Sequence, residues 1–147
     1  ADGSFIGGGA DFAESIEHLG AKSGYGPGDV LEIDPTGQRR VALATTPYST
    51  RVAGIYSTKP GLLGRQWDDE DPRFAQEIPM AIVGIVPCRV SAENGRIEVG
   101  DLLVTSSTPG HAMKGTKRKR MPGAVVGKAL EPLASGTGTI EVLVTLQ

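Results

Sequence analysis

Apolar residues along this chain come in short runs that are separated by glycine, proline and polar turns. We expect strands at 30–34, 40–44, 51–57, 80–86, 102–106, 125–130 and 139–146. In the last run the apolar residues alternate with polar ones, as in a strand with one buried face. Short strands joined by tight turns predict an all-β fold of roughly nine or ten strands: a compact barrel, a sandwich or a β-clip-like domain.

Turn residues refine this pattern. The Asp-Pro-Thr-Gly sequence at 34–37 predicts a hairpin, because proline presets φ and glycine accepts a positive φ. Asn94-Gly95 predicts a second hairpin, between Val90 and Ile97. The run at 80–86 is almost wholly apolar, which is typical of a strand buried on both faces. Residues 65–77 and 107–123 are interpreted as loops.

One phrase occurs twice. Gly28-Asp29 and Gly100-Asp101 each stand directly before an apolar strand, and each is followed by a second apolar strand with a glycine in its middle, Gly54 or Gly127. This internal pseudo-repeat predicts two halves that pack as a pair. We expect a flexible lead-in at 1–10 and a single all-β C-terminal domain at 11–147.

The segment at 11–20 allows two interpretations. Phe12, Ile16 and Leu19 fall on one helical face, with Asp11 as a possible N-cap and Gly20 as a stop. Alternation along a strand would instead place Phe12 and Ile16 on a common face with Glu14 and His18. The local pattern slightly favours the helix, and the all-β surroundings favour the strand.

Composition excludes several classes of function. Charged residues make up 22% of the chain and the net charge is -2, so we expect neither nucleic acid nor a membrane as a partner. No segment approaches the roughly 20 apolar residues of a membrane span. The single cysteine, Cys88, alternates with valines and is expected to be a small buried hydrophobe.

Cofactor chemistry has little support in the residues. Two histidines and one cysteine show no metal-ligand spacing, and the acidic run at 68–71 lacks the pattern of a calcium loop. Phosphate-binding loops and a Gly-x-Ser-x-Gly elbow are absent from the sequence. We therefore expect no cofactor and no metal.

A basic run is the first candidate site. Five cations lie between Lys114 and Arg120, close in sequence to His111. His111, Lys117 and Arg118 are candidate contacts for a phosphate or a glycan. The alternatives are a solvated loop, or a loop that pairs across a subunit boundary with the acids at 68–71.

The carboxylates of Asp11, Glu14 and Glu17 are the second candidate site, just after Gly7-Gly8-Gly9. Two carboxyl groups beside a flexible peptide can share acid and base roles if one of them stays protonated. The alternative is that Asp11 and Glu14 only cap a helix or satisfy loop amides.

At these residues the chain resembles a known family. The Asp-Phe-Ala-Glu opening at 11–14 is similar to that of the C-terminal maturation domains of phage neck-appendage and tail-spike proteins, and of related bacterial fibre modules. The similarity continues through Gly28-Asp29 and through the phrase Gly-Ile-x-Ser-x-x-Pro-x-x-x-Gly at 54–64, and then into residues 78–90. It covers most of residues 10–130.

The resemblance implies a homotrimer that acts as an intramolecular chaperone for the fibre region upstream in the same chain. It also implies possible self-cleavage, with Asp11 and Glu14 as catalytic acids and a scissile bond around Gly9 and Ala10. Glycines stand where the family has a small polar residue before its motif, so the resemblance favours a fibre cap over a peptidase. A location outside the cell, at a cell surface or in a virion is favoured. A ligand- or glycan-binding β module is a further alternative.

Overall fold

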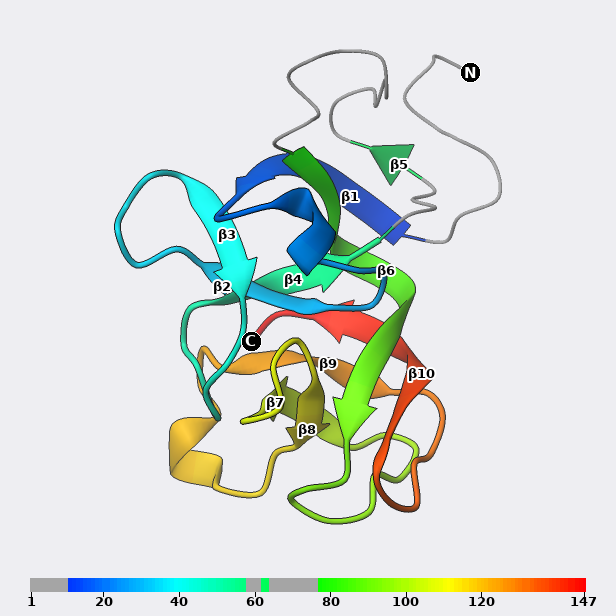
Figure 1. The fold of residues 1–147 in the computed structure, drawn as a ribbon. Helices are drawn as coiled ribbons and strands as arrows, with labels where there is room; N and C mark the ends of the chain where they lie inside the picture. Colours follow the sequence, from blue (N-terminus) through cyan, green and yellow to red (C-terminus); the bar gives the residue numbers. More distant parts are fainter. Residues whose placement is uncertain (1–10, 58–61, 64–76) are drawn as a thin grey trace.

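The protein is built from short strands around one long strand. The computed structural model describes residues 11–57, 62–63 and 77–147 (Figure 1). The strands are β1 (Asp11–His18), β2 (Val30–Ile33), β3 (Arg40–Leu43), β4 (Val52–Tyr56), β5 (Leu62–Leu63), β6 (Glu77–Ser91), β7 (Leu102–Thr105), β8 (Ala112–Lys114), β9 (Val125–Ala129) and β10 (Thr137–Thr145). Among the described residues, the helical elements are the short 3-10 turns η1 (Lys22–Gly24) and η3 (Arg118–Arg120). This confirms the predicted all-β class.

Strand β6 belongs to two rings of strands. Its C-terminal part pairs with β8 and β10, and β7 and β9 complete a closed five-stranded barrel. Its N-terminal part pairs with β4 and β1, and β2 and β3 complete a second ring of five strands. In Figure 1, β6 runs from the ring of β1 to β4 down to the ring of β7 to β10. The 15 residues of β6 thus join the two halves of the chain.

The two rings are built from equivalent strands. In the first ring β1 runs parallel to β3, with His18 opposite Val41; in the second, β6 runs parallel to β8, with Val90 opposite Ala112. The β2–β4 and β7–β9 pairs each contain a register shift at the same step, after Leu31 in one and after Leu103 in the other. The pseudo-repeat is therefore present in the fold, and it extends beyond the sequence echo to include β1 and β10.

The apolar faces of these strands meet in three buried clusters. The largest spans both rings and includes Ile55, Val86, Cys88 and Val142. Cys88 is fully buried, as expected, and burial raises the pKa of its thiol far above the ordinary value. Smaller clusters form around Leu31 in the first ring and around the neighbouring strands β7, β8 and β9 in the second.

Four local expectations can be compared with the structure. The segment at 11–18 is a strand, because it pairs along β6 from Asp11 to Glu17. The hairpin at 34–37 is confirmed by the β2–β3 pairing. The hairpin predicted at Asn94-Gly95 is wrong: these residues form a turn, but Ile97 bridges to Leu133, and β6 pairs with β10 and β8 instead. The loop predicted at 107–123 contains β8 and η3.

The strand predicted at 80–86 was expected to be buried on both faces, but two of its apolar side chains are exposed to solvent. Val83 is 54% exposed and Ile85 is 42% exposed. Their neighbours Met80, Ala81 and Val86 are buried, as expected. The outer face of β6 therefore carries apolar side chains that the described part of the chain leaves in contact with solvent.

Candidate functional site

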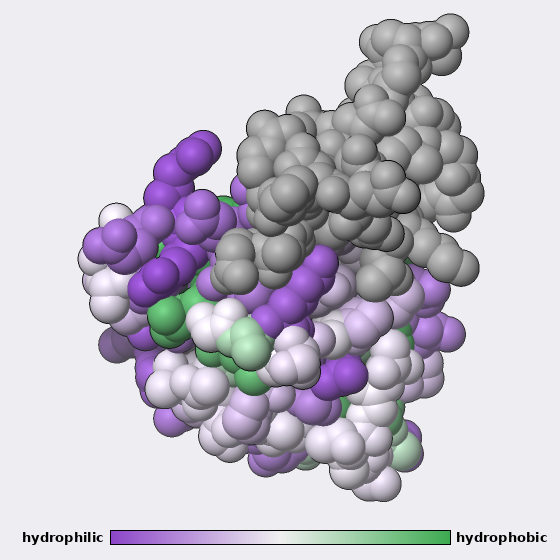
Figure 2. Space-filling model, turned by 45° about the horizontal axis from the view of Figure 1, so that its top comes forward, coloured by the Kyte–Doolittle hydropathy of each residue, from purple (hydrophilic) through white to green (hydrophobic). Residues whose placement is uncertain are grey.

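Glu14 lies on β1 in a groove of about 560 Å³ at the outer end of the first ring. Pairing places its backbone opposite Met80 of β6, and its side chain is exposed. The groove is lined by Glu14, Ser15, Ile16, Glu17, Gln38, Arg39 and Glu77. Figure 2 shows hydrophilic side chains over much of the face turned toward the viewer, with smaller apolar patches between them.

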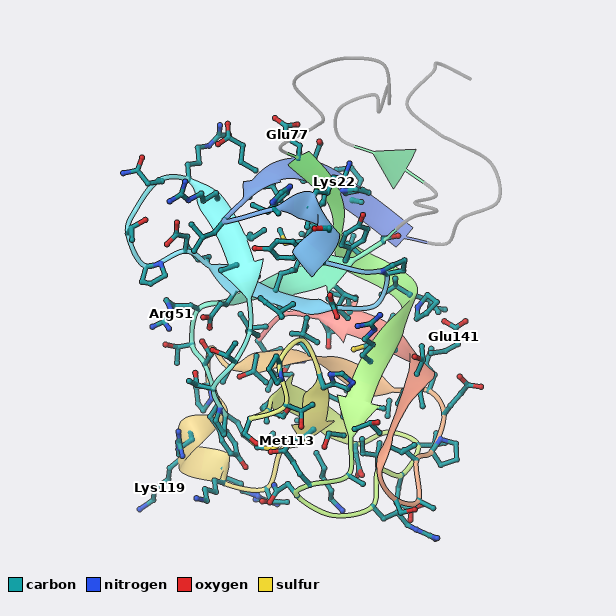
Figure 3. The ribbon with its side chains drawn as sticks, in the orientation of Figure 1. Lys22, Arg51, Glu77, Met113, Lys119 and Glu141 are labelled. Atoms are coloured by element: carbon teal, nitrogen blue, oxygen red, sulfur yellow. The ribbon has the colours of Figure 1, made fainter. Side chains whose placement is uncertain are left out.

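The groove brings together carboxylates from two strands. Glu14 and Glu17 come from β1 and Glu77 comes from the start of β6. Ser15 donates a hydrogen bond from Oγ to Oε1 of Glu77 at 2.7 Å. Figure 3 shows Glu77 at this end of the fold. Glu77 was not anticipated from the sequence, because only the strand pairing places it beside β1.

Of the other candidate residues for cleavage, the structure describes only the backbone of Asp11. The backbone of Asp11 pairs with Gly84, and its side chain lies outside the described part of the structure. Gly9 and Ala10 lie outside the described residues, as do the acids at 68–71. Within 11–57, 62–63 and 77–147, no group of three or more acidic, histidine or cysteine side chains could hold a metal ion.

Strand β8 separates His111 from Lys117 and Arg118. Nδ1 of His111 lies 2.8 Å from the carbonyl oxygen of Pro109, just before β8 begins. Lys117 and Arg118 follow β8, at η3, and both are exposed. The three residues of β8 and the two that follow it separate His111 from Lys117 along the chain, and His111 does not line the groove that includes Arg118. The structure therefore brings the two cations together, but not the histidine.

Tyr48 holds the basic segment in place, and sequence reasoning missed it. Its hydroxyl accepts hydrogen bonds from the backbone N–H groups of Thr116 and Lys117, both at 3.0 Å. The Arg120 guanidinium lies over its ring, 4.7 Å from the centroid. Burial raises the pKa of Tyr48, but these hydrogen bonds and the charge of Lys117 outweigh it and leave the pKa below the ordinary value.

The backbone of Tyr48 is itself unusual. Its φ of 54° lies in the left-handed region, which a bulky residue rarely adopts. The Thr105 side chain supports this turn: its Oγ1 accepts a hydrogen bond from the Ser49 N–H at 2.7 Å and donates one to the Thr46 carbonyl at 2.7 Å. The only sequence signal for this contact is the preceding Pro47, which marks a turn but not its distant partner.

A second groove, of about 850 Å³, lies beside η3. Its lining is Gly100, Asp101, Leu102, Gly115, Thr116, Arg118, Met121, Pro122, Gly123, Val125 and Gln147. The half-buried apolar side chains of Leu102, on β7, and Met121 therefore lie in the same groove as a cation. Of the candidate residues, this groove includes Arg118 and leaves out His111.

A row of apolar side chains crosses the outer face of β6. Val83 stands opposite Phe12 of β1, and Ile85 stands opposite Leu143 of β10. Directly paired residues of antiparallel strands project to the same face. Phe12 and Leu143 are half-buried, whereas Val83 and Ile85 are more exposed. We call these four residues the apolar row.

Comparisons with known proteins place the fold. No family model matches the chain, and no curated protein matches it. The crystal structure of the pre-mature bacteriophage phi29 gene product 12 matches with a TM-score of 0.63 at 15% identity, over 93% of this chain and 22% of that chain. This chain therefore spans about a fifth of that gene product.

The C-terminal fragment of the same gene product also matches. Its TM-score is 0.52 at 14% identity, over 92% of this chain and 100% of that fragment. The N base of the phi29 head fiber gp8.5 matches at a TM-score of 0.45, too low to carry an argument. The chain thus shares its fold with a phage gene product, and the resemblance seen in the sequence is confirmed at the level of fold.

No helix in the described part of the chain is long and apolar enough to cross a membrane.

Proposed function

We propose that this chain is the C-terminal trimerisation and folding cap of a fibre or spike-like protein of a phage or a cell surface. Its partners are two further copies of itself and the fibre region upstream in the same chain. The observation that carries the proposal is the apolar row on β6. The similarity in fold to the C-terminal fragment of phage gene product 12 supports it.

The apolar row has the character of a subunit contact. Val83 and Ile85 are two residues apart on one strand, and Phe12 and Leu143 extend their face onto both neighbouring strands. Contiguous exposed apolar side chains on a soluble domain mark an interaction surface. A self-association that covers this row would remove four large apolar side chains from water.

The cap role follows from the physics of fibre assembly. Three chains of a repetitive fibre have no strong register signal of their own. A compact domain that trimerises first raises the local concentration of the other chains to roughly millimolar. The two closed rings suit this role, because closure leaves few unpaired strand edges that could aggregate.

Charge substitution in the apolar row tests the proposal. Val83→Lys combined with Ile85→Lys should convert the trimer to a monomer, as measured by light scattering with mass detection. Both side chains are exposed, so the fold should tolerate the change. The matched control is Val99→Lys, since Val99 is 64% exposed in a turn away from the row. A double variant that stays trimeric overturns the assignment of the row.

Self-cleavage is a second candidate function, favoured by the groove whose lining includes the carboxylates of Glu14, Glu17 and Glu77. A pair of carboxyl groups can divide the roles of general acid and general base between them. The groove lies on β1, the strand that directly follows the candidate scissile region at Gly9 and Ala10.

Mass spectrometry of a longer stretch of the native chain distinguishes self-cleavage from the cap function alone. If cleavage occurs, mass spectrometry should find a cut near residue 10 that Glu14→Gln abolishes and Glu98→Gln, an exposed control, does not. A chain that stays intact over days excludes the peptidase and leaves the cap proposal standing.

A further inference from the structure

We propose that the groove beside η3, with the cations Lys117, Arg118 and Lys119, binds an anionic polysaccharide chain. This site goes beyond the proposed cap function and does not depend on it. It rests on four properties of the segment 115–121: unpaired charge, a fixed backbone, an apolar floor and the lack of a stacking aromatic residue.

The positive charge of this segment is not neutralised within the described part of the chain. Lys117, Arg118 and Lys119 are exposed and make no ion pair with any described carboxylate. Lys114 pairs with Asp101 at 3.7 Å, and Arg120 stacks on Tyr48. Figure 3 shows Lys119 projecting away from the body at η3. Three adjacent cations in a chain of net charge -2 make a local site for a polyanion.

The backbone that carries these cations is fixed before any ligand binds. The Tyr48 hydroxyl accepts from two successive N–H groups, those of Thr116 and Lys117. On the other side, Asn94 donates from Nδ2 to the Lys114 carbonyl at 2.8 Å. A backbone that is already rigid loses less conformational entropy when a ligand binds. The left-handed φ of Tyr48 is a strained arrangement of the kind that persists at functional sites.

The adjoining groove gives the site a floor suited to sugar rings. Leu102 and Met121, both half-buried, supply apolar surface for the C–H faces of a pyranose, and Thr116 and Asp101 supply hydrogen-bonding groups for its hydroxyls. Arg118 stands at the groove with its guanidinium available to a carboxylate, sulfate or phosphate group. Apolar floor and cation together fit an acidic sugar chain better than a small inorganic ion.

A nucleic acid fits this site less well. Binding of single strands uses aromatic side chains on which bases stack. The described residues that line this groove include no aromatic one. Tyr48, which contacts the basic segment, is 6% exposed and its ring is covered by Arg120. The ligand class is therefore an anionic glycan, and an oligonucleotide serves as the comparison ligand in the test.

The test measures binding of the whole chain to polygalacturonate oligomers by calorimetry, with neutral dextran and a single-stranded oligonucleotide of equal charge as comparison ligands. The unaltered protein should bind the acidic oligomer, bind the oligonucleotide at least fivefold more weakly, and not bind dextran. Lys117→Ala, Arg118→Ala and Lys119→Ala together should weaken binding at least tenfold. Arg96→Ala with Lys128→Ala removes two exposed cations elsewhere and should change binding less than twofold.

Tyr48→Phe tests the fixed backbone, since it removes only the hydroxyl that holds Thr116 and Lys117. It should weaken binding severalfold while the thermal melt remains cooperative. Arg118→Glu is a second variant in case the triple substitution perturbs the fold. Any one of three results overturns the proposal: no binding of the acidic oligomer, equal binding by the triple variant and the control, or an oligonucleotide that binds as tightly as the glycan.

Discussion

The side chains of Asp29 and Asp101 make the same hydrogen bond in the two halves of the molecule. Oδ2 of Asp29 accepts from the backbone N–H of Gly26 at 2.8 Å, and Oδ2 of Asp101 accepts from the backbone N–H of Glu98 at 2.8 Å. Each carboxylate therefore closes a turn onto the residue three positions earlier. The doubled sequence phrase is a duplicated turn.

The backbone around the two turns is equivalent as well. Gly28 and Gly100 have φ values of 89° and 92°, in the region that favours glycine. Gly28 N–H donates to the Tyr56 carbonyl at 2.9 Å, and Gly100 N–H donates to the Ala129 carbonyl at 2.7 Å. Each Gly-Asp turn thus fixes the start of one strand against the end of the glycine-containing strand that follows it.

The two aspartates should differ in their contribution to stability. Asp29 is buried and pairs with Arg89 at 3.0 Å, whereas Asp101 is more exposed and pairs with Lys114 at 3.7 Å. Asp29→Ala should lower the free energy of unfolding by about 2 kcal/mol, because the buried carboxylate accepts from the half-buried Gly26 N–H and pairs with Arg89, and both partners lose it. Asp101→Ala should lower it by about 1 kcal/mol. Urea unfolding measures both, and equal losses would contradict the account.

The glycines in the middle of β4 and β9 should not tolerate a methyl group. A Cβ at Gly54 would collide with the Ala81 carbonyl oxygen, and one at Gly127 would collide with the Leu143 carbonyl oxygen. Because the obstacle is backbone in both cases, Gly54→Ala and Gly127→Ala should each destabilise by about 2–3 kcal/mol.

The matched control for these two glycines is Gly24→Ala, where a Cβ meets nothing within 4 Å. Its effect on thermal unfolding should be close to zero. A Gly54 or Gly127 variant that melts with the control would mean that the two glycine strands are not packed as described.

The sequence predicts most of the strands and the repeat, because alternation and turn residues act locally. It does not decide the state of residues 11–18, since their helical pattern is overridden by pairing along β6. It also misplaces the partner of Ile97, because the turn at Asn94-Gly95 is real but the strands beside it pair with distant segments.

In the candidate sites, too, the sequence predicts what is local and misses what depends on distant contacts. The carboxylates and the basic run are visible as sequence motifs, whereas their neighbours are set by tertiary contacts. Glu77 reaches Glu17 and Ser15 only through the β1–β6 register, and Tyr48 reaches Lys117 only through a contact between two loops. Neither contact can be predicted from the residues that are close in sequence.

His18 should make stability depend on pH. It is 4% exposed, its ring packs against that of Tyr25 at a tilt of 52°, and neither ring nitrogen has a hydrogen-bond partner among the described residues. Burial lowers the pKa of His18 below the ordinary 6.5. The Gly20 backbone opposes this shift without completing a hydrogen bond. Of the nearby charges, Lys22 lowers the pKa and Glu17 raises it. The folded state thus favours the neutral ring, so stability is full above about pH 6.5 and falls as pH drops below it.

His18→Val should remove this dependence, since the equivalent position in the second ring is Val90. The difference in melting temperature between pH 7.5 and 5.5 should shrink in the variant. The control His111→Asn removes the other histidine, which is half-buried, and should leave the difference unchanged. An unaltered pH slope in His18→Val would show that another group is responsible.

Glu93 should stabilise the fold near neutral pH and lose this effect in acid. Burial raises the pKa of its carboxyl, but hydrogen bonds from Ser107 and Thr108 outweigh this and lower the pKa from 4.5 to about 2. A lowered folded pKa means that its stabilising effect is present above about pH 4.5 and is lost as pH falls towards 2. Glu93→Gln should therefore melt at a lower temperature at pH 6 and converge with the parent chain near pH 2.

Glu98→Gln is a suitable control for this titration, because Glu98 is exposed and its carboxylate only approaches Arg96 at 3.8 Å. Its melting temperature should follow that of the parent across the range. Parallel curves for Glu93→Gln and the parent from pH 6 to pH 2 would be inconsistent with the hydrogen-bonded carboxylate.

The central claim is self-association into a trimer through the apolar row, and the mass of the assembled protein tests it most directly. Sedimentation equilibrium of the unaltered chain at micromolar concentration should give three times the 15.3 kDa mass of one chain. A mass of one chain at every concentration up to about 100 µM, well above the range in which stable interfaces assemble, would contradict the account.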